Sequence, residues 1–144
     1  MTDDNAARSG ATAVLPPLHT RPIGKYSPGM SVPLGDGRRM VFVSGQVASD
    51  AEGRTIAPGD PAAQAEAVFE RLSDVLEQAG GTLADLVSVV VYLVRMSDFA
   101  AVSEVRNRVL SDPAPASTLV EVSALAIADH LVEISGVAVV PDPS

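Results

Sequence analysis

The run of mostly β-branched residues at positions 87–94, with the sequence VSVVVYLV, limits the folds open to this chain more than any other segment. A near-continuous apolar run of this length is typical of a central strand that is covered on both faces. A central strand needs further strands beside it and helices to cover it. We therefore expect a core built around a sheet.

The segment before this run predicts one long amphipathic helix. Asp60 is a suitable N-cap, and Pro61 would occupy the first helical position. Gly80 and Gly81 end the helix with a left-handed cap, and a capped turn over 82–86 leads into the strand. The apolar residues recur at helical spacing along one face, at Val68, Leu72, Val75, Leu76 and Ala79.

The remaining pattern predicts a hairpin before this helix and two strands near the C-terminus. Residues 28–34 alternate, 35–37 (GDG) form a turn, and 40–43 (MVFV) form a buried strand that SGQ at 44–46 follows directly. A second helix opens at Ser97-Asp98 and is broken by the prolines of 112–115. Strands follow at 118–122 and 131–140.

The resulting order, ββαβαββ, predicts an α+β fold with one mixed sheet packed against two helices and hairpins at both ends. Such a sheet leaves its other face uncovered, and an aliphatic face of that size predicts oligomerisation. The length of 144 residues suits one domain, which we place at residues 21–141. Residues 1–20 are small, polar and aperiodic, and they are expected to form a flexible arm.

Composition excludes several classes of function. The chain has no cysteine, which excludes disulfides, thiolate metal sites and cysteine nucleophiles. Ten Lys and Arg against 18 Asp and Glu give a net charge of −8, and no basic stripe for nucleic acid is present. No apolar run reaches the ~20 residues of a membrane span. The acidic, polar N-terminus is not a signal peptide, so a cytoplasmic location is expected.

Glu133 is the strongest candidate for chemistry. It lies in the apolar run LVEI, and desolvation on a half-buried strand raises a carboxyl pKa toward the range of a general acid or base. The alternative is a glutamate that points outward from an exposed sheet face, and Glu121 has the same ambiguity. Tyr26 is either a hydroxyl donor in a pocket or an ordinary surface residue.

Other kinds of site find little support in the sequence. His130 and Glu133 are three residues apart, which on a strand directs them to opposite faces, so no metal site is expected. The GDG turn lacks the further glycine of a phosphate-binding loop. Ser44 has no histidine and aspartate at the spacing of a catalytic triad. We expect neither a metal nor a cofactor.

Five segments, in this order and at nearly the same spacing, resemble the RidA family, also called the YjgF or reactive-intermediate-deaminase family. They cover residues 21–140 in all, and they are IGKYSP at 23–28, VSGQ at 43–46, SDFAAV at 97–102, PASTLVEV at 115–122 and LVEI at 131–134.

The resemblance implies a chorismate-mutase-like α+β fold and a homotrimer. The three sheets would form a barrel-like centre, with a small-molecule cleft at each subunit interface. The best-known members hydrolyse 2-imino or 2-enamino acids to 2-oxo acids and ammonia without metal or cofactor. In them an arginine in a Pro-Ala-Arg-Ser context binds the substrate carboxylate, and a glutamate on the last strand activates water. A tyrosine and a Ser-Gly turn complete the cleft.

Carried over to this sequence, the tyrosine is Tyr26, the Ser-Gly turn is Ser44 and Gly45, and the catalytic glutamate is Glu133. The family arginine falls on Ser117. A serine hydroxyl offers one neutral hydrogen bond where the guanidinium fork offers two charge-assisted ones. The chain is therefore not expected to be an ordinary 2-imino-acid deaminase.

The chain departs from the family at three more positions. Leu119 replaces a small substrate-binding residue, Ser103 replaces an asparagine, and Ser135 stands where acidic residues are common. Arg106 or Arg108 would have to reach the cleft to replace the missing arginine. The family is also labelled an endoribonuclease, and the charge of −8 argues against that activity here.

Two classes of function remain open. The first is an enzyme that acts on a small imine, enamine or related carbonyl compound without the usual carboxylate placement. The second is a trimer that binds a metabolite or a partner and catalyses nothing.

Overall fold

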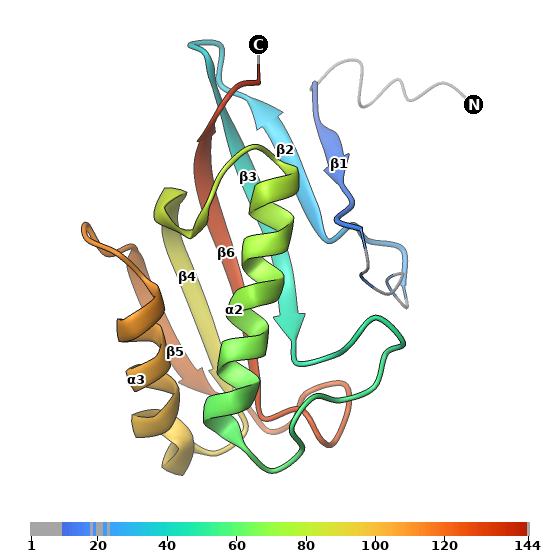
Figure 1. Cartoon of the computed structure of the whole chain (residues 1–144), viewed down its shortest axis with the longest axis vertical. Coiled ribbons are helices and arrows are strands. Elements are labelled where there is room, and N and C mark those ends of the chain that lie inside the picture. The colour runs from blue at the N-terminus through green and yellow to red at the C-terminus, as the bar shows by residue number, and fades with distance from the viewer. Residues whose placement is uncertain (1–9, 18, 20–21, 23, 144) are drawn as a thin grey trace.

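The computed structural model describes residues 10–17, 19, 22 and 24–143, which form a single six-stranded sheet with two α-helices. Figure 1 shows both helices lying across the same face of the sheet. The α+β class is confirmed. The strands are β1 (Thr12–Val14), β2 (Gly29–Pro33), β3 (Arg38–Val47), β4 (Leu86–Leu93), β5 (Ala116–Glu121) and β6 (Val132–Pro141). The helices are α2 (Pro61–Gln78) and α3 (Phe99–Val109), with 3-10 turns at η1 (Leu83–Asp85) and η2 (Met96–Asp98).

Helix α2 begins and ends where its sequence signals predict. The carboxylate of Asp60 accepts a hydrogen bond of 3.1 Å from the backbone N–H of Ala63. Gly80 has a φ of +92°, the left-handed conformation that ends a helix. The apolar face packs on the sheet, and its buried residues include Val68, Phe69, Leu72, Val75 and Leu76. None of the helices in the described chain is long and apolar enough to cross a membrane.

The sheet order is β1-β2-β3-β6-β4-β5. Strand β6 pairs antiparallel with both β3 and β4, and β5 pairs in parallel with β4 after the crossover through α3. The predicted C-terminal hairpin is therefore wrong, because β4 separates the last two strands. A parallel partner needs a helical crossover, which α3 provides, and the last strand then enters the centre of the sheet.

The sheet face opposite the helices is uncovered in the single chain. Along β6, residues at alternate positions are buried under the helices, while those between them are only half-buried. Phe42 pairs across the sheet with Met30 and Val137, and its side chain is 47% exposed. Within one chain, the 87–94 strand is thus covered on one face only, and the expectation of cover on both faces is not met.

A bulge interrupts β3 close to its C-terminal end. The pairing of β3 with β6 shifts between Val43 and Gln46. Ser44 and Gly45 lie in this irregularity, within the strand, whereas the sequence placed them after the strand end. Such a bulge bends the strand and changes the direction of the following side chains.

Part of the expected N-terminal arm belongs to the sheet. Thr12–Val14 pairs antiparallel with Gly29–Ser31, and the side chain of Val14 is buried in the core. The arm of residues 1–20 therefore contains an edge strand, because three residues are enough to pair with β2 although they are too few to show a period. Residues 1–9 of the arm lie outside the described residues.

Candidate functional site

A cavity of about 190 Å³ lies where the ends of β3 and β6 approach helix α2. Its lining includes three residues that the sequence singled out and three that come from the helix and the loop before β6. They are Tyr26, Gly45, Arg71, Ile127, His130 and Glu133. The cavity is the centre of the candidate site because the predicted catalytic glutamate lines it.

Glu133 is the second residue of β6, between the two strands that flank it. Its backbone is in register with Val47 of β3 and Tyr92 of β4, and its side chain is half-buried. Burial raises the pKa of the Glu133 carboxyl above its ordinary value of 4.5. The side chain thus lines the cavity, and the alternation along β6 directs it to the sheet face that the helices leave uncovered, where it is half-buried rather than fully exposed.

The β3 bulge places Gly45 directly against this carboxyl group. A Cβ atom built on Gly45 would lie 2.8 Å from Cδ of Glu133, so that any side chain at position 45 would force Glu133 to move. Ser44 does not line the cavity. Its hydroxyl donates a hydrogen bond of 2.6 Å to the backbone carbonyl of Ser27, and so it anchors the segment that carries Tyr26.

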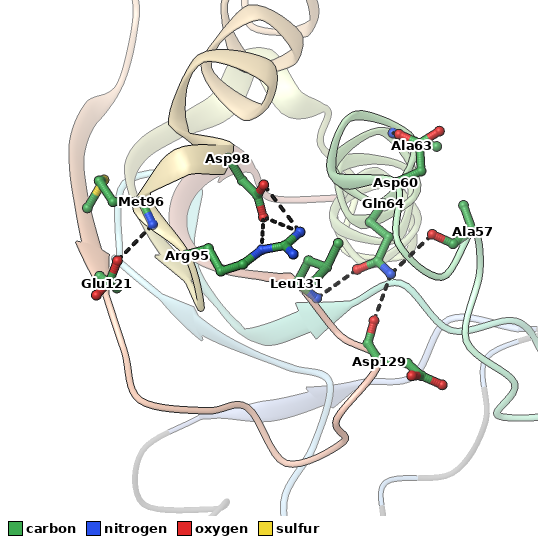
Figure 2. Close-up of polar contacts among 10 residues, drawn as sticks. All are labelled: Ala57, Asp60, Ala63, Gln64, Arg95, Met96, Asp98, Glu121, Asp129 and Leu131. Carbon is green, nitrogen blue, oxygen red and sulfur yellow. Dashed lines mark hydrogen bonds and ion pairs between the residues drawn. The ribbon is translucent and has the colours of Figure 1, made fainter.

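The loop before β6 is fixed by Gln64, a fully buried residue of α2. Its Nε2 donates to the backbone carbonyl of Asp129 at 2.9 Å, and its Oε1 accepts from the backbone N–H of Leu131 at 2.8 Å. Figure 2 shows the amide bridging both residues. Because His130 lies between these two residues, the Gln64 side chain fixes the position of His130 and of the backbone that leads into β6.

His130 is buried, and its Nε2 lies 3.4 Å from the Ser49 hydroxyl. Desolvation lowers the His130 pKa below its ordinary 6.5; nearby Asp129 opposes this shift and Arg71 adds to it. The prediction that His130 and Glu133 face opposite sides is wrong, since both line the cavity. The alternation of a strand does not apply, because β6 begins only at Val132.

The predicted residues of β5 lie elsewhere in the single chain. Ser117 lines a separate groove with Arg106 and Asn107, and Leu119 packs against the hydrophobic core. Arg108 forms an ion pair with Glu66. The structure therefore brings Tyr26, Gly45 and Glu133 together, and it leaves Ser117 and Leu119 outside this cavity.

Arg71 and His130 are the cavity residues whose role the sequence reasoning missed. The sequence did hold a signal for Arg71. Position 71 is three residues after Val68 and four before Val75, so its spacing places this arginine beside the apolar face of α2 that packs on the sheet. His19, to which the sequence gave no role, lines the same cavity and bonds Asp74 at 2.9 Å.

The cavity combines a carboxyl group of raised pKa, an imidazole of lowered pKa and a guanidinium. Among the described residues, no group of three or more histidine, aspartate or glutamate side chains is placed to hold a metal ion. The arrangement supplies groups that exchange protons and one cation that can bind an anion.

A family model described as endoribonuclease L-PSP matches residues 18–140. The chain belongs to this family, the RidA family. A RutC family protein of Pyrococcus abyssi is 38% identical over 118 residues, which cover 82% of this chain and 88% of that protein. Protein DfrA of Myxococcus xanthus is 38% identical over 117 residues, covering 81% of this chain and 86% of that protein.

Solved structures of RidA proteins have the same fold. The RidA of the Antarctic bacterium Psychrobacter sp. PAMC 21119 is 35% identical, with a TM-score of 0.76 over 88% of this chain and 98% of that chain. The YjgF product of E. coli is 28% identical, with a TM-score of 0.75 over 89% of this chain and 98% of that chain. The mixed sheet with two helices on one face is thus the RidA fold.

Proposed function

We propose that this RidA-family chain is a small-molecule enzyme that acts on an imine, an enamine or a related carbonyl metabolite in the cavity beside Glu133. The observation that carries the proposal is the half-buried carboxyl group of Glu133, held against Gly45 inside a cavity of metabolite size. Membership of the RidA family supports an imine-deaminase-like or small-molecule-binding role.

The reaction that fits this carboxyl group is the hydrolysis of a C=N bond. The Glu133 carboxylate removes a proton from water, and the water oxygen forms a bond to the imine carbon. The C=N π electrons move to nitrogen, and the carboxyl group returns the proton there to form a carbinolamine. The carboxylate then takes the hydroxyl proton and passes it to the amino nitrogen, the C–N bond breaks as the C=O bond forms, and ammonia leaves with a carbonyl product. A carboxyl pKa raised by burial serves both steps, because the group both accepts and releases the proton near neutral pH.

The second part of the proposal concerns the substrate. The position of the family arginine is Ser117, which is exposed and lies outside the Glu133 cavity. Its neutral hydroxyl is a weaker partner for a carboxylate than a guanidinium fork. The proposed substrate therefore differs from ordinary 2-imino acids in the placement of its charged group.

The third part is a homotrimer with the site at each subunit interface. The uncovered sheet face, with Phe42 at its centre, supports burial against neighbouring copies. Ser117 and Leu119 lie on β5, at the edge of the sheet, where they would meet a neighbouring subunit. In such an assembly the partner's β5 would complete the cleft beside Glu133.

The decisive experiment measures ammonia release from a panel of small imines, generated in place by an amino-acid or amine oxidase, with wild-type protein and Glu133→Gln. The variant keeps the shape of the side chain and removes the proton-transfer group, so the rate should fall about 10²–10⁴-fold. Equal turnover by both proteins would contradict the assigned role of Glu133. Ligand binding without turnover by the wild type would favour a non-catalytic binding protein.

A further inference from the structure

Arg71 differs from most arginines of the described chain in lacking an ion-pair partner. Four others form ion pairs with carboxylates, namely Arg38 with Asp36, Arg54 with Asp50 and Glu52, Arg95 with Asp98, and Arg108 with Glu66. Within the described residues no carboxylate lies within ion-pair distance of Arg71, although this side chain is partly buried at the wall of the cavity.

Among the described residues, the Arg71 side chain donates one hydrogen bond. Nη1 donates one bond of 2.8 Å to the backbone carbonyl of Ser49, which fixes the position of the guanidinium. The buried Nε has no hydrogen-bond partner among the described residues. A guanidinium carries five N–H donors in a planar fork that matches a carboxylate. A buried Nε–H without a partner is costly unless an acceptor from a bound molecule pairs with it.

The groups around Arg71 do not supply such an acceptor. Asp74 lies one turn further along α2, is half exposed, and is bonded to His19 at 2.9 Å. Tyr26 and His130 also face the cavity, and the low pKa of buried His130 keeps its ring uncharged near neutral pH. Arg71 therefore brings a cationic group to the cavity, and Asp74, the carboxylate whose charge acts on Arg71, is bonded to His19.

We propose that Arg71 binds the carboxylate of the metabolite and so takes the role for which the β5 position offers only Ser117. The inference rests on the proposed function of the Glu133 cavity and adds its substrate class: a small carbonyl, imine or enamine compound that carries a carboxylate. The geometry differs from an arginine on β5, because the guanidinium approaches from helix α2.

The positions of Arg71 and Glu133 in the cavity indicate where the reacting carbon of a bound substrate would lie. Arg71 comes from helix α2 and Glu133 from strand β6, and both line the same cavity. A carboxylate bound at Arg71 leaves the C=N or C=O carbon of the same molecule in the space beside Glu133.

The test compares two probes of the same shape, 4-oxopentanoate and 4-oxopentanamide, of which only the first is charged. Their affinities for the wild-type protein are measured by ligand-observed NMR titration. Charge-assisted hydrogen bonds predict that the carboxylate binds about 10- to 100-fold more tightly than the amide. Arg71→Gln should abolish this preference, and Arg71→Lys, which keeps the charge without the fork, should retain only part of it.

Arg106→Gln is the matched control, because within the described part of the chain Arg106 also has no ion pair but lines the groove beside Ser117. This variant should keep the wild-type preference for the carboxylate. Loss of the preference in Arg106→Gln and its retention in Arg71→Gln would overturn the proposal, as would equal binding of both probes to the wild type. Thermal melts of each variant establish that it is folded.

The two proposals fail in different ways. If Glu133 has no catalytic role, the carboxylate preference still depends on Arg71, because binding requires no turnover. If Arg71 has no binding role, Glu133→Gln still slows imine hydrolysis while Arg71→Gln leaves the carboxylate preference intact.

Discussion

Gly45 lies so close to the Glu133 carboxyl group that any side chain at position 45 would displace the glutamate. A Cβ atom there would overlap Oε2 and lie 2.8 Å from Cδ. The close approach arises from the bulge in β3, where the pairing register with β6 shifts between Val43 and Gln46. The glycine therefore defines where the carboxyl group stands in the cavity.

Gly45→Ala is expected to impair catalysis far more than folding. The obstructing atoms are the end of a flexible side chain, so Glu133 can rotate away at little cost in stability. A misplaced catalytic group can reduce a rate by about 10²-fold. We expect imine hydrolysis to fall to that extent, with a change of less than about 1 kcal/mol in the free energy of unfolding. Unchanged turnover would show that the glutamate position is not critical.

Glu133→Gln should raise stability at neutral pH. Below pH 4.5 the carboxyl is protonated in the folded and the unfolded chain, so its burial costs little. As the pH rises from 4.5 through the raised folded pKa, the unfolded state ionises first, and the folded state bears the cost of desolvation. The melting temperature of the variant should thus exceed that of the wild type increasingly over this window and then level off.

Thermal melts measured from about pH 4 to about pH 8 check this prediction, because this range begins near the ordinary carboxyl pKa and extends well above it. Glu104→Gln, at an exposed position of α3, removes one negative charge from the acidic chain without changing the cavity. A gain in stability that is equal in both variants would indicate relief of net charge and would contradict the burial argument.

Gln64→Leu should destabilise the protein by about 1–3 kcal/mol, the cost of leaving buried backbone groups without partners. The leucine fills a similar space, but it leaves the carbonyl of Asp129 and the N–H of Leu131 without hydrogen-bond partners. Urea unfolding gives the free-energy difference. Gln78→Leu, at an exposed position at the end of the same helix, should change stability by less than about 0.5 kcal/mol.

Phe42→Lys is expected to dissociate the proposed homotrimer. Phe42 is 47% exposed on the uncovered sheet face, and a buried lysine there would lack a partner. Light scattering should give about three times the chain mass of 14.8 kDa for the wild type and less for the variant. Leu34→Lys, an exposed hydrophobic residue next to the β2–β3 turn, should remain trimeric. A monomeric wild type would contradict the assembly.

Local signals in the sequence determined the long helix, its caps and the strand that follows it. Asp60, Pro61 and Gly80 act within one or two turns, and the apolar period of α2 needs no distant partner to be recognised. The apolar setting of Glu133 likewise indicated a raised pKa, which burial in the cavity produces. The family resemblance rested on ordered motifs and is confirmed.

Features that depend on long-range pairing did not follow from the sequence. The insertion of β6 between β3 and β4 brings together segments about ninety positions apart in the chain, a pairing that no local pattern encodes. The strand at 12–14 is too short to have a period, and only its pairing with β2 and the burial of Val14 define it.

The composition of the cavity shows the same division. The sequence by itself indicated that Glu133 stands in an apolar strand, and the family resemblance predicted that Ser117 occupies the position of the family arginine. Only the tertiary structure decided that His130 shares the cavity with Glu133 and that Arg71 faces it from helix α2. The physical reason is that the local sequence periodicity determines which side of a strand or helix a residue occupies. Its neighbours across the fold depend instead on the packing of elements that are distant in sequence.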